Sequence, residues 1–322
     1  YYLPQRVSAG LDPWATPQAY DNAKDFFDTG ITWSNSLNVA QMLEKSSYSI
    51  SLGNTHQDGI ISSTGMDRYN VKVSAGTKLT SNWSSGFTAN YITTSIDKAV
   101  TSGNGLLRTV YAAPPSYDLA GIPSHVDGNP YTQNSFRGSF DNAYWAMENN
   151  KFTEDTNRFF GNVYASYQTD FGTTNHKLNA KYMVGVDAYT THYVDSYGYG
   201  SNTGGGRGQI ENYGWTNATY NSLLTINYDW HINEDWGLNA VVGNEIIQSN
   251  RKKYYEYGTN YNFPGWNHIN NATTQQTEEE TWKNRTVGFF GNVSASYRNM
   301  LYLTLTGRQD YVSNMPRNNR CV

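Results

Sequence analysis

The sequence has little charge, a single cysteine and no long apolar run, and each shortage excludes something. Charged residues make up 16% of the 322 residues and the net charge is −4, so the chain lacks the basic surface of a nucleic-acid-binding protein. Cys321 is the only cysteine, which excludes an internal disulfide. No stretch approaches the ~18 consecutive apolar residues that a membrane-spanning helix needs. Such a chain can cross a membrane only as strands of a closed barrel, because lipid offers no partner to open backbone groups.

Recognisable catalytic patterns are also missing. The six histidines are scattered, with no pair at the spacing of metal ligands. The glycine-rich stretch 198–208 lacks the strand and helix that flank a phosphate-binding loop, so we interpret it as a plain loop. A carboxylate pair that meets only in space stays possible. We therefore predict no enzyme, no metal site and no cofactor.

The residues that are abundant suit β-strands. Aromatic residues make up 15% of the chain, with 27 Tyr and 9 Trp, and aromatic side chains favour the pleated surface of a sheet. Between 178 and 188 the residues Leu178, Ala180, Tyr182, Val184, Val186 and Ala188 alternate with Asn179, Lys181, Met183, Gly185 and Asp187. A period of two gives a strand one apolar and one polar face. The same pattern recurs near 69–76, 83–91 and 301–306.

The connections between the predicted strands alternate in length. Short polar turns are expected at 43–46, 80–82, 171–175, 231–235 and 298–299, and longer segments near 54–66, 97–156, 194–208 and 251–281. We predict ten strands of roughly 12–15 residues, more than the ~9–11 that a tilted strand needs to cross a bilayer. Outer-membrane barrels combine short periplasmic turns with long extracellular loops. The predicted fold is therefore all-β, an antiparallel transmembrane β-barrel segment.

Aromatic residues also lie at the strand ends that border the short turns. They are Trp83 and Trp236, just after such turns, and Tyr167, Tyr228 and Tyr297, just before them. Aromatic girdles lie where hydrocarbon meets water in membrane barrels, although aromatics favour strands in general. We interpret these residues as one girdle.

One nonapeptide occurs twice. FFGNVYASY at 159–167 returns as FFGNVSASY at 289–297, and a short turn follows both copies. The separation is far longer than the ~20–50 residues of a solenoid repeat. We expect two equivalent barrel strands that run in the same direction.

A series of short motifs runs along nearly the whole chain. They are DFFDTG at 25–30, YSISLG at 48–53, QDGI at 57–60, YWAMENN at 144–150 with NR at 157–158, VGNE at 242–245, LYLTLTGRQD at 301–310 and RNNR at 317–320. In this order they resemble the barrel of SusC-like (SusC/RagA family) TonB-dependent outer-membrane transporters. The resemblance implies a barrel of 22 strands with a plugged lumen.

By this resemblance the chain is part of a longer barrel. Residues 1–30 would connect the plug to the barrel and hold a short helix within 21–28. Residues 31–322 would form about ten of the 22 strands of the TonB-dependent receptor barrel. Ten strands cannot close at that diameter, and an open edge in lipid leaves backbone groups unsatisfied, so we expect a fragment.

The resemblance further implies active import across the cell outer membrane. The cargo would be a bulky nutrient, an oligosaccharide or an oligopeptide, and a SusD-like lipoprotein would cap the barrel from outside. Energy would come through the TonB complex, which would contact a region N-terminal to this chain. Outer-membrane lipid would surround the barrel, and no nucleic acid is expected as a partner.

Candidate site residues fall into two sets. The aromatics of the two longest predicted loops are candidate contacts for substrate or partner: Tyr111, Tyr117, Tyr131, Trp145, Tyr254, Tyr255, Tyr261 and Trp266. Packing of the loops against each other, or against the lipoprotein, explains any one of these rings better than ligand binding. The polar strand faces give the lumen-facing candidates Lys72, Lys181, Asp187, Asn239 and Glu245, although such groups mostly pair within the wall. We also predict that Glu245 contacts the plug.

Two other classes share parts of this pattern. A passive porin-like channel has the same strand alternation but no plug, so a plug upstream of this segment would separate the two. A surface carbohydrate-binding β-sandwich would close its apolar faces into a core, with strands nearer ~5–6 residues. The long strands and the regular alternation of turn and loop argue against the sandwich.

Overall fold

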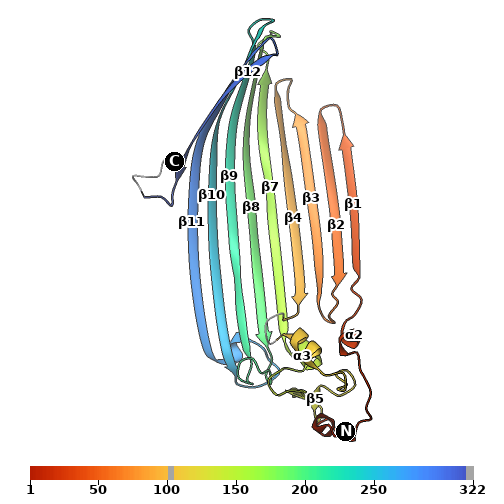
Figure 1. Ribbon diagram of the computed structural model, residues 1–322. Coiled ribbons are helices and arrows are strands. Elements are labelled where there is room, and N and C mark those ends of the chain that lie inside the picture. Colours follow the sequence, from red (N-terminus) through yellow and green to blue (C-terminus); the bar gives the residue numbers. More distant parts are fainter. Residues whose placement is uncertain (101–104, 317–322) are drawn as a thin grey trace.

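The computed structural model describes residues 1–100 and 105–316. Its main element is one antiparallel sheet of ten strands, arranged in the order in which they follow one another along the chain (Figure 1). The predicted all-β fold with ten antiparallel barrel strands is confirmed. The RNNR motif at 317–320 and Cys321 lie outside the described residues.

The strands of this sheet range from 11 residues in β1 to 26 in β10 and β11. They are β1 (Thr32–Met42), β2 (Ser46–Asp58), β3 (Gly65–Lys78), β4 (Trp83–Lys98), β7 (Lys151–Thr169), β8 (His176–Tyr197), β9 (Gln209–His231), β10 (Trp236–Tyr261), β11 (Ala272–Tyr297) and β12 (Leu301–Val312). A separate two-stranded ribbon consists of β5 (His125–Val126) and β6 (Asn129–Gln133).

The helices are short and lie outside the sheet. They are α1 (Pro4–Val7), α2 (Asn22–Phe26), α3 (Leu106–Ala112), α4 (Ala143–Asn149) and the 3-10 turn η1 (Ile269–Asn271). None of the helices in residues 1–100 and 105–316 is long and apolar enough to cross a membrane.

Short and long connections lie at opposite ends of the sheet (Figure 1). The short turns are 43–45, 79–82, 170–175, 232–235 and 298–300, and the longer connections are 59–64, 99–150, 198–208 and 262–271. The predicted alternation is confirmed. Two of the predicted loops are too long, because most of 54–66 and of 251–281 is strand.

The strands were predicted too short for a physical reason. On β10 the apolar alternation stops after Ile246, and both faces carry polar side chains from Gln248 to Lys253. The backbone ladder with β11 nevertheless continues as far as the pair Tyr261 and Ala272. A strand whose two faces both meet water gives no period-two signal, so its true end is not visible in the sequence.

The pairing register gives the sheet one apolar and one polar face. Residues paired directly across neighbouring strands share a face. The row Leu37, Leu52, Val71, Tyr91 and Phe159 belongs to the apolar face. The next row, Asn38, Ser51, Lys72, Asn90 and Phe160, belongs to the polar face.

The repeated nonapeptide occupies equivalent positions in β7 and β11. Both strands run from the long-loop end to the short-turn end. Phe159 and Phe289 lie on the apolar face, whereas Phe160 and Phe290 lie on the polar face. The expectation that the two copies are equivalent strands is confirmed.

The apolar face is limited to a band next to the short turns. On β10 the band comprises Trp236, Leu238, Ala240, Val242, Asn244 and Ile246. Ten residue steps at about 3.3 Å cover about 33 Å along the strand, or about 25 Å across a bilayer at the ~40° tilt of barrel strands. This matches the ~25 Å apolar band of outer-membrane barrels.

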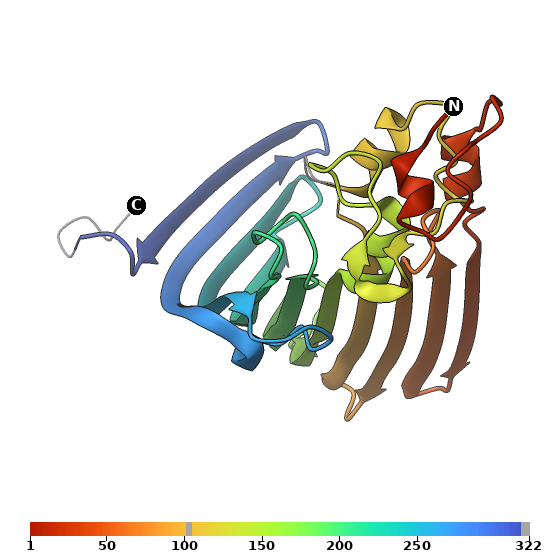
Figure 2. The same cartoon turned by 90° about the horizontal axis from the view of Figure 1, so that it is seen from below.

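The sheet is curved, and its loop end carries the helices on the concave side (Figure 2). A hollow on the sheet is lined mainly by polar-face residues, among them Ser49, Ser74, Thr88 and Tyr164. The polar face is therefore the concave one, and the apolar band lies on the convex side.

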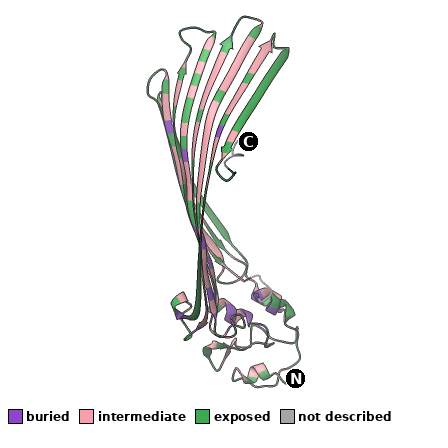
Figure 3. Cartoon of the chain, turned by 90° about the vertical axis from the view of Figure 1, so that its left-hand side faces the viewer, coloured by how far each residue is buried: buried purple, intermediate pink, exposed green. Residues whose placement is uncertain are grey.

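Most buried side chains lie in the layer of long loops rather than in the sheet (Figure 3). The core of this layer consists of Phe26, Leu106, Val110, Tyr117, Leu119, Ile122, Ala143, Trp145 and Ala146. We call the packed segments 1–30, 99–100, 105–150, 198–208 and 262–271 the loop layer. A sheet exposed on both faces buries few side chains by itself, so the loops form their own small core.

Residues 1–30 belong to this loop layer. Asn22 donates to the Tyr117 carbonyl (2.9 Å) and accepts from the Leu119 amide (3.1 Å), and the expected short helix is present as α2. The role of residues 1–30 as the connection from a plug stays a prediction. It would require the preceding chain to reach the long-loop end of the barrel.

Candidate lumenal site and loop layer

All five predicted lumen-facing residues lie on the polar face. Lys72 pairs across to Asn90, which pairs to Phe160 and then to Asp187. Lys181, Asn239 and Glu245 occupy the same face on β8 and β10. The alternation thus placed them together, and their facing a lumen stays a prediction.

Two of the five form ion pairs within the sheet. Asp187 accepts both Arg158 Nε (2.8 Å) and Arg158 Nη2 (2.6 Å) in a two-pronged pair. Glu245 accepts from Arg308 on β12 at 2.8 Å. Glu245 is therefore neutralised by the wall itself, and its predicted contact with a plug stays untested.

The other three differ in how they are held. Lys181 Nζ lies 4.6 Å from the centre of the Tyr164 ring, a cation–π contact. Asn239 donates to Asp229 at 2.6 Å, on the neighbouring strand β9. Lys72 has no ion-pair partner among residues 1–100 and 105–316.

Three predicted contact aromatics are buried and cannot meet a ligand. Trp145 and Tyr261 are each 0% exposed, and Tyr117 is 4% exposed. Trp145 packs in the core of the loop layer and donates from its indole to the Pro130 carbonyl at 2.8 Å. The prediction that these three residues contact a ligand or partner is therefore corrected, because their side chains are buried inside the protein. Tyr117 and Trp145 belong to the core of the loop layer, whereas Tyr261 packs with Ile210 and Ala272 at the loop ends of β9, β10 and β11. Large aromatic rings supply much of the apolar surface in both small cores.

Two others belong to a strand rather than a loop. Tyr254 and Tyr255 lie in β10, where they pair with β11, so their assignment to a loop is corrected. Tyr254 lies on the convex side, where its hydroxyl bonds to His192. Tyr255 lies on the concave side.

The remaining three are accessible or partly so. Tyr111 is 68% exposed and Trp266 is 44% exposed, while Tyr131 is half-buried. Trp266 stacks between Phe263 (5.9 Å between ring centres) and His268 (4.9 Å) in the 262–271 loop. Tyr111 and Trp266 stay candidates for contact with a ligand or a partner.

A buried carboxylate joins two of the long loops. Asp141, only 7% exposed, accepts hydrogen bonds from Gln133 Nε2 (2.8 Å), Ser201 Oγ (2.6 Å) and both the amide and the side chain of Asn202 (2.8 Å each). Asn267 reaches from the third loop to the Asn149 carbonyl at 3.0 Å. The three loops are thus fixed to one another.

The concave face carries an aromatic cluster that the sequence analysis did not identify. Tyr193 and Tyr213 stack with 4.8 Å between ring centres, and Trp215 meets both edge-on. Arg251 lies over the Trp215 ring at 5.3 Å and over the Trp282 ring at 5.6 Å. We call these five residues the concave-face cluster.

Three charged groups border this cluster, one lysine and two carboxylates. Lys98 lies 4.6 Å over the Tyr193 ring and pairs with Glu154 at 3.5 Å. The Tyr213 hydroxyl donates to Asp195 at 3.0 Å. Both carboxylates are therefore already engaged by the wall. A signal for the cluster existed in the sequence, since Tyr193, Tyr213 and Trp215 are closely spaced aromatics, but only the register shows that they meet.

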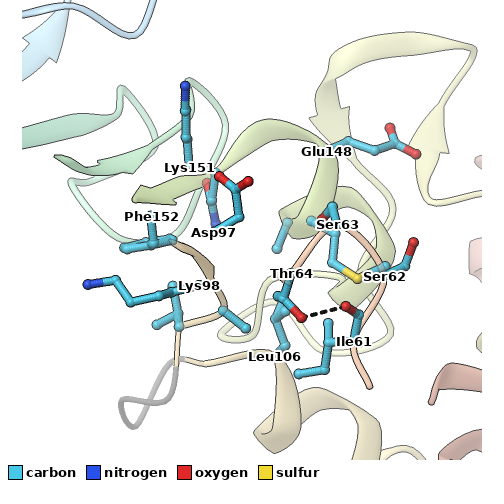
Figure 4. Close-up of a pocket in the computed structure, with 15 residues that line it drawn as sticks. Ile61, Ser62, Ser63, Thr64, Asp97, Lys98, Leu106, Glu148, Lys151 and Phe152 are labelled. Carbon is cyan, nitrogen blue, oxygen red and sulfur yellow. Dashed lines mark hydrogen bonds between the residues drawn. The ribbon is translucent and has the colours of Figure 1, made fainter. Parts of the chain in front are cut away.

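A cavity of 340 Å³ lies where β4 meets the loop layer (Figure 4). Its lining includes Thr64, Lys98, Glu148 and Phe152. Thr64 donates to the Ile61 carbonyl at 2.6 Å and so closes one wall. We assign this cavity no function. Within residues 1–100 and 105–316, no group of three or more His, Cys, Asp or Glu side chains could hold a metal ion.

Comparison with known proteins adds a likeness of fold. No protein-family model matches the chain, and no curated protein matches its sequence. Among solved structures, the RagAB peptide importer in its closed-closed state is similar over 95% of this chain, with a TM-score of 0.77 and 17% identity. The same importer in its open-open state gives a TM-score of 0.77 at 16% identity.

The fold is similar to that of one section of the matched importer chain. This chain spans 35% of the matched chain in both states, about a third of its length. At this identity the likeness concerns the architecture of the sheet and loops alone. It agrees with an open sheet whose edge strands β1 and β12 are not paired with each other in the described residues.

Proposed function

We propose that this chain forms part of the wall of a TonB-dependent importer in the outer membrane. The observation that carries the proposal is the apolar band on the convex face. Within it Val242 is 56% exposed, Phe289 54%, Leu303 63% and Leu305 66%. A soluble monomer rarely exposes a contiguous apolar patch of more than a few hundred Å². Hydrocarbon is the medium in which such a band is stable.

The orientation follows from the connections. In outer-membrane barrels the short turns face the periplasm and the long loops face the outside. The loop layer with its own core would then cover the outer mouth, and the concave face would line the lumen. The concave-face cluster lies five residues beyond the band on β10, counted from Ile246 to Arg251, and would line the lumen near its outer mouth.

Active import by this wall would need parts beyond the chain. A plug would obstruct the lumen, TonB would drive its movement, and a SusD-like lipoprotein would cap the loop layer. The likeness to a peptide importer supports an oligopeptide cargo. The aromatic and amide-rich loops support an oligosaccharide equally. The chain itself would carry out no chemistry on the cargo.

A passive porin-like channel is the second candidate, because it needs the same two-faced wall. The β-sandwich is not supported. In the described part of the chain no second sheet packs against the ten-stranded one, and the only other sheet is the two-stranded ribbon β5–β6.

Uptake in cells separates the importer from the porin. Cells carrying the full-length protein would be given fluorescent oligopeptides and oligosaccharides, with TonB present or deleted. Accumulation that requires TonB supports the importer. Accumulation that is unchanged without TonB, and rises linearly with cargo concentration, would show a passive channel instead.

A further inference from the structure

We infer that Arg251 recognises a carboxylate on the imported molecule, while the rings beside it pack against the body of that molecule. The inference rests on the proposed function, since it places the cluster in the lumen of an importer. It adds a binding site and a chemical class of cargo.

The first observation is how Arg251 is held. Its guanidinium lies between the Trp215 ring (5.3 Å) and the Trp282 ring (5.6 Å), on strands to either side of β10. Both distances fall within the ~6 Å of a cation–π contact. Two flanking indoles restrict the space open to the Arg251 side chain, so less side-chain freedom is lost when it binds.

The second observation is that Arg251 has no carboxylate partner in the part of the chain that the structure describes. Arg158 and Arg308 on the same concave face each bind a carboxylate of the wall, at 2.6 Å and 2.8 Å. Arg251 has no carboxylate within 4.0 Å among residues 1–100 and 105–316. Arg251 is also exposed.

The third observation concerns the neighbouring carboxylates. Glu154 is paired with Lys98, and Asp195 accepts from Tyr213. Lys98 offsets the charge of Glu154, whereas Asp195 keeps its negative charge because its donor is a neutral hydroxyl. Glu280 also shares the concave face with Trp282, and it pairs directly across to the cationic Lys253. A guanidinium presents its donors in a planar fork that matches a carboxylate, which gives both strength and orientation. Carboxylate is thus the group that fits Arg251.

The rings give the second half of the site. Tyr193 and Tyr213 form a flat stacked pair with an interplanar angle of 6°, and Trp215 stands nearly perpendicular at 86° to Tyr213. They form a corner next to the cation. A ring or apolar segment attached to the carboxylate would rest in this corner. Both an acidic oligosaccharide and an oligopeptide with a free C-terminus carry this combination.

Binding of paired probes to the purified full-length protein tests the inference, with quenching of tryptophan fluorescence as the readout. The sugar pair is trigalacturonate and its methyl ester. The peptide pair is a tetrapeptide with a free C-terminal carboxylate and the same peptide with a C-terminal amide. Within each pair the two probes differ only in whether the carboxyl group is charged or neutral, and the rest of the molecule is the same.

Variants of Arg251 test whether this residue causes the preference for the charged probes. Arg251→Gln should weaken binding of the acid probes about tenfold or more and leave binding of the neutral probes unchanged. Arg251→Lys should bind the acid probes with an affinity between those of the unchanged protein and Arg251→Gln, because lysine keeps the charge but lacks the planar fork of donors. Arg285→Gln is the matched control, since Arg285 lies on the convex face of the next strand and bonds to Gln248. Electrophoretic mobility of the unheated protein checks that each variant is folded.

Each outcome decides the inference. Preference for trigalacturonate that Arg251→Gln abolishes identifies an acidic sugar, and the same result with the peptide acid identifies a peptide terminus. Equal binding of acid and neutral forms, no binding of any probe, or an equal loss in Arg285→Gln would overturn it. TonB-dependent uptake of a neutral cargo would leave the importer standing while this inference fails.

Discussion

An arginine placed at the centre of the apolar band should reveal which side of the sheet faces lipid. Val242 and Val241 are adjacent in β10, are the same residue type and lie on opposite faces. Val242 lies six residues from Trp236, or about 15 Å deep at a ~40° tilt, near the middle of a bilayer. Arginine on the lipid face costs about 2–4 kcal/mol at this depth.

The two variants therefore make a matched experiment. Val242→Arg should reduce the folded-to-unfolded ratio of the full-length protein by roughly 30-fold to 1000-fold, and Val241→Arg should change it by less than about fivefold. Urea titration in lipid vesicles, followed by tryptophan fluorescence and by gel mobility without heating, measures both. Equal destabilisation by the two substitutions, or a larger effect at Val241, would refute the assignment of the convex face to lipid.

Three further expectations concern the loop layer and the polar face. Asp141→Ala should lower the local stability of the loop layer by about 3 kcal/mol, because the donors that now bind one buried carboxylate lose their acceptor. Faster hydrogen exchange at 198–208 would show this loss. Unchanged exchange would contradict the role of Asp141 in joining the loops. Burial raises the pKa of Tyr117 to about 12. Because the unfolded chain then releases the proton at lower pH than the folded one, the free energy of unfolding of the loop layer should fall by about 2 kcal/mol as pH rises from 10 to 12. Tyr117→Phe should remove this loss and leave the stability at neutral pH unchanged, since the hydroxyl has no hydrogen-bond partner in the described residues. A loss of stability between pH 10 and 12 that persists in Tyr117→Phe would contradict this prediction. Glu245→Ala should change overall stability by less than about 1 kcal/mol, because its bond to Arg308 is solvent-exposed, but should alter transport and plug protection from exchange if Glu245 contacts the plug.

Within the apolar band, the sequence alone was sufficient to predict the strands and the face on which each side chain lies. The alternation at 178–188 predicted a strand, its two faces and the grouping of Lys181 with Asp187, because lipid on one side and water on the other force a period of two. The short turns were equally visible, since polar turn residues interrupt the pattern.

Beyond the band the sequence was insufficient. The upper half of β10 meets water on both sides, so Tyr254 and Tyr255 looked like loop residues although they are paired to β11. Burial of Trp145 could not be predicted either, because it depends on segments far apart in the chain that pack into one core. Arg251 meets Trp215 and Trp282 only through the register of three strands, which no local pattern encodes.

The most direct test of the two-faced wall uses single cysteines at Lys181 and Tyr182, introduced after Cys321→Ser. These neighbours in β8 lie on the concave and convex faces. Each cysteine would carry a fluorophore in the full-length protein reconstituted with nitroxide-labelled lipid. Our account expects strong quenching at position 182 and little at 181. Equal quenching, or stronger quenching at 181, would contradict it.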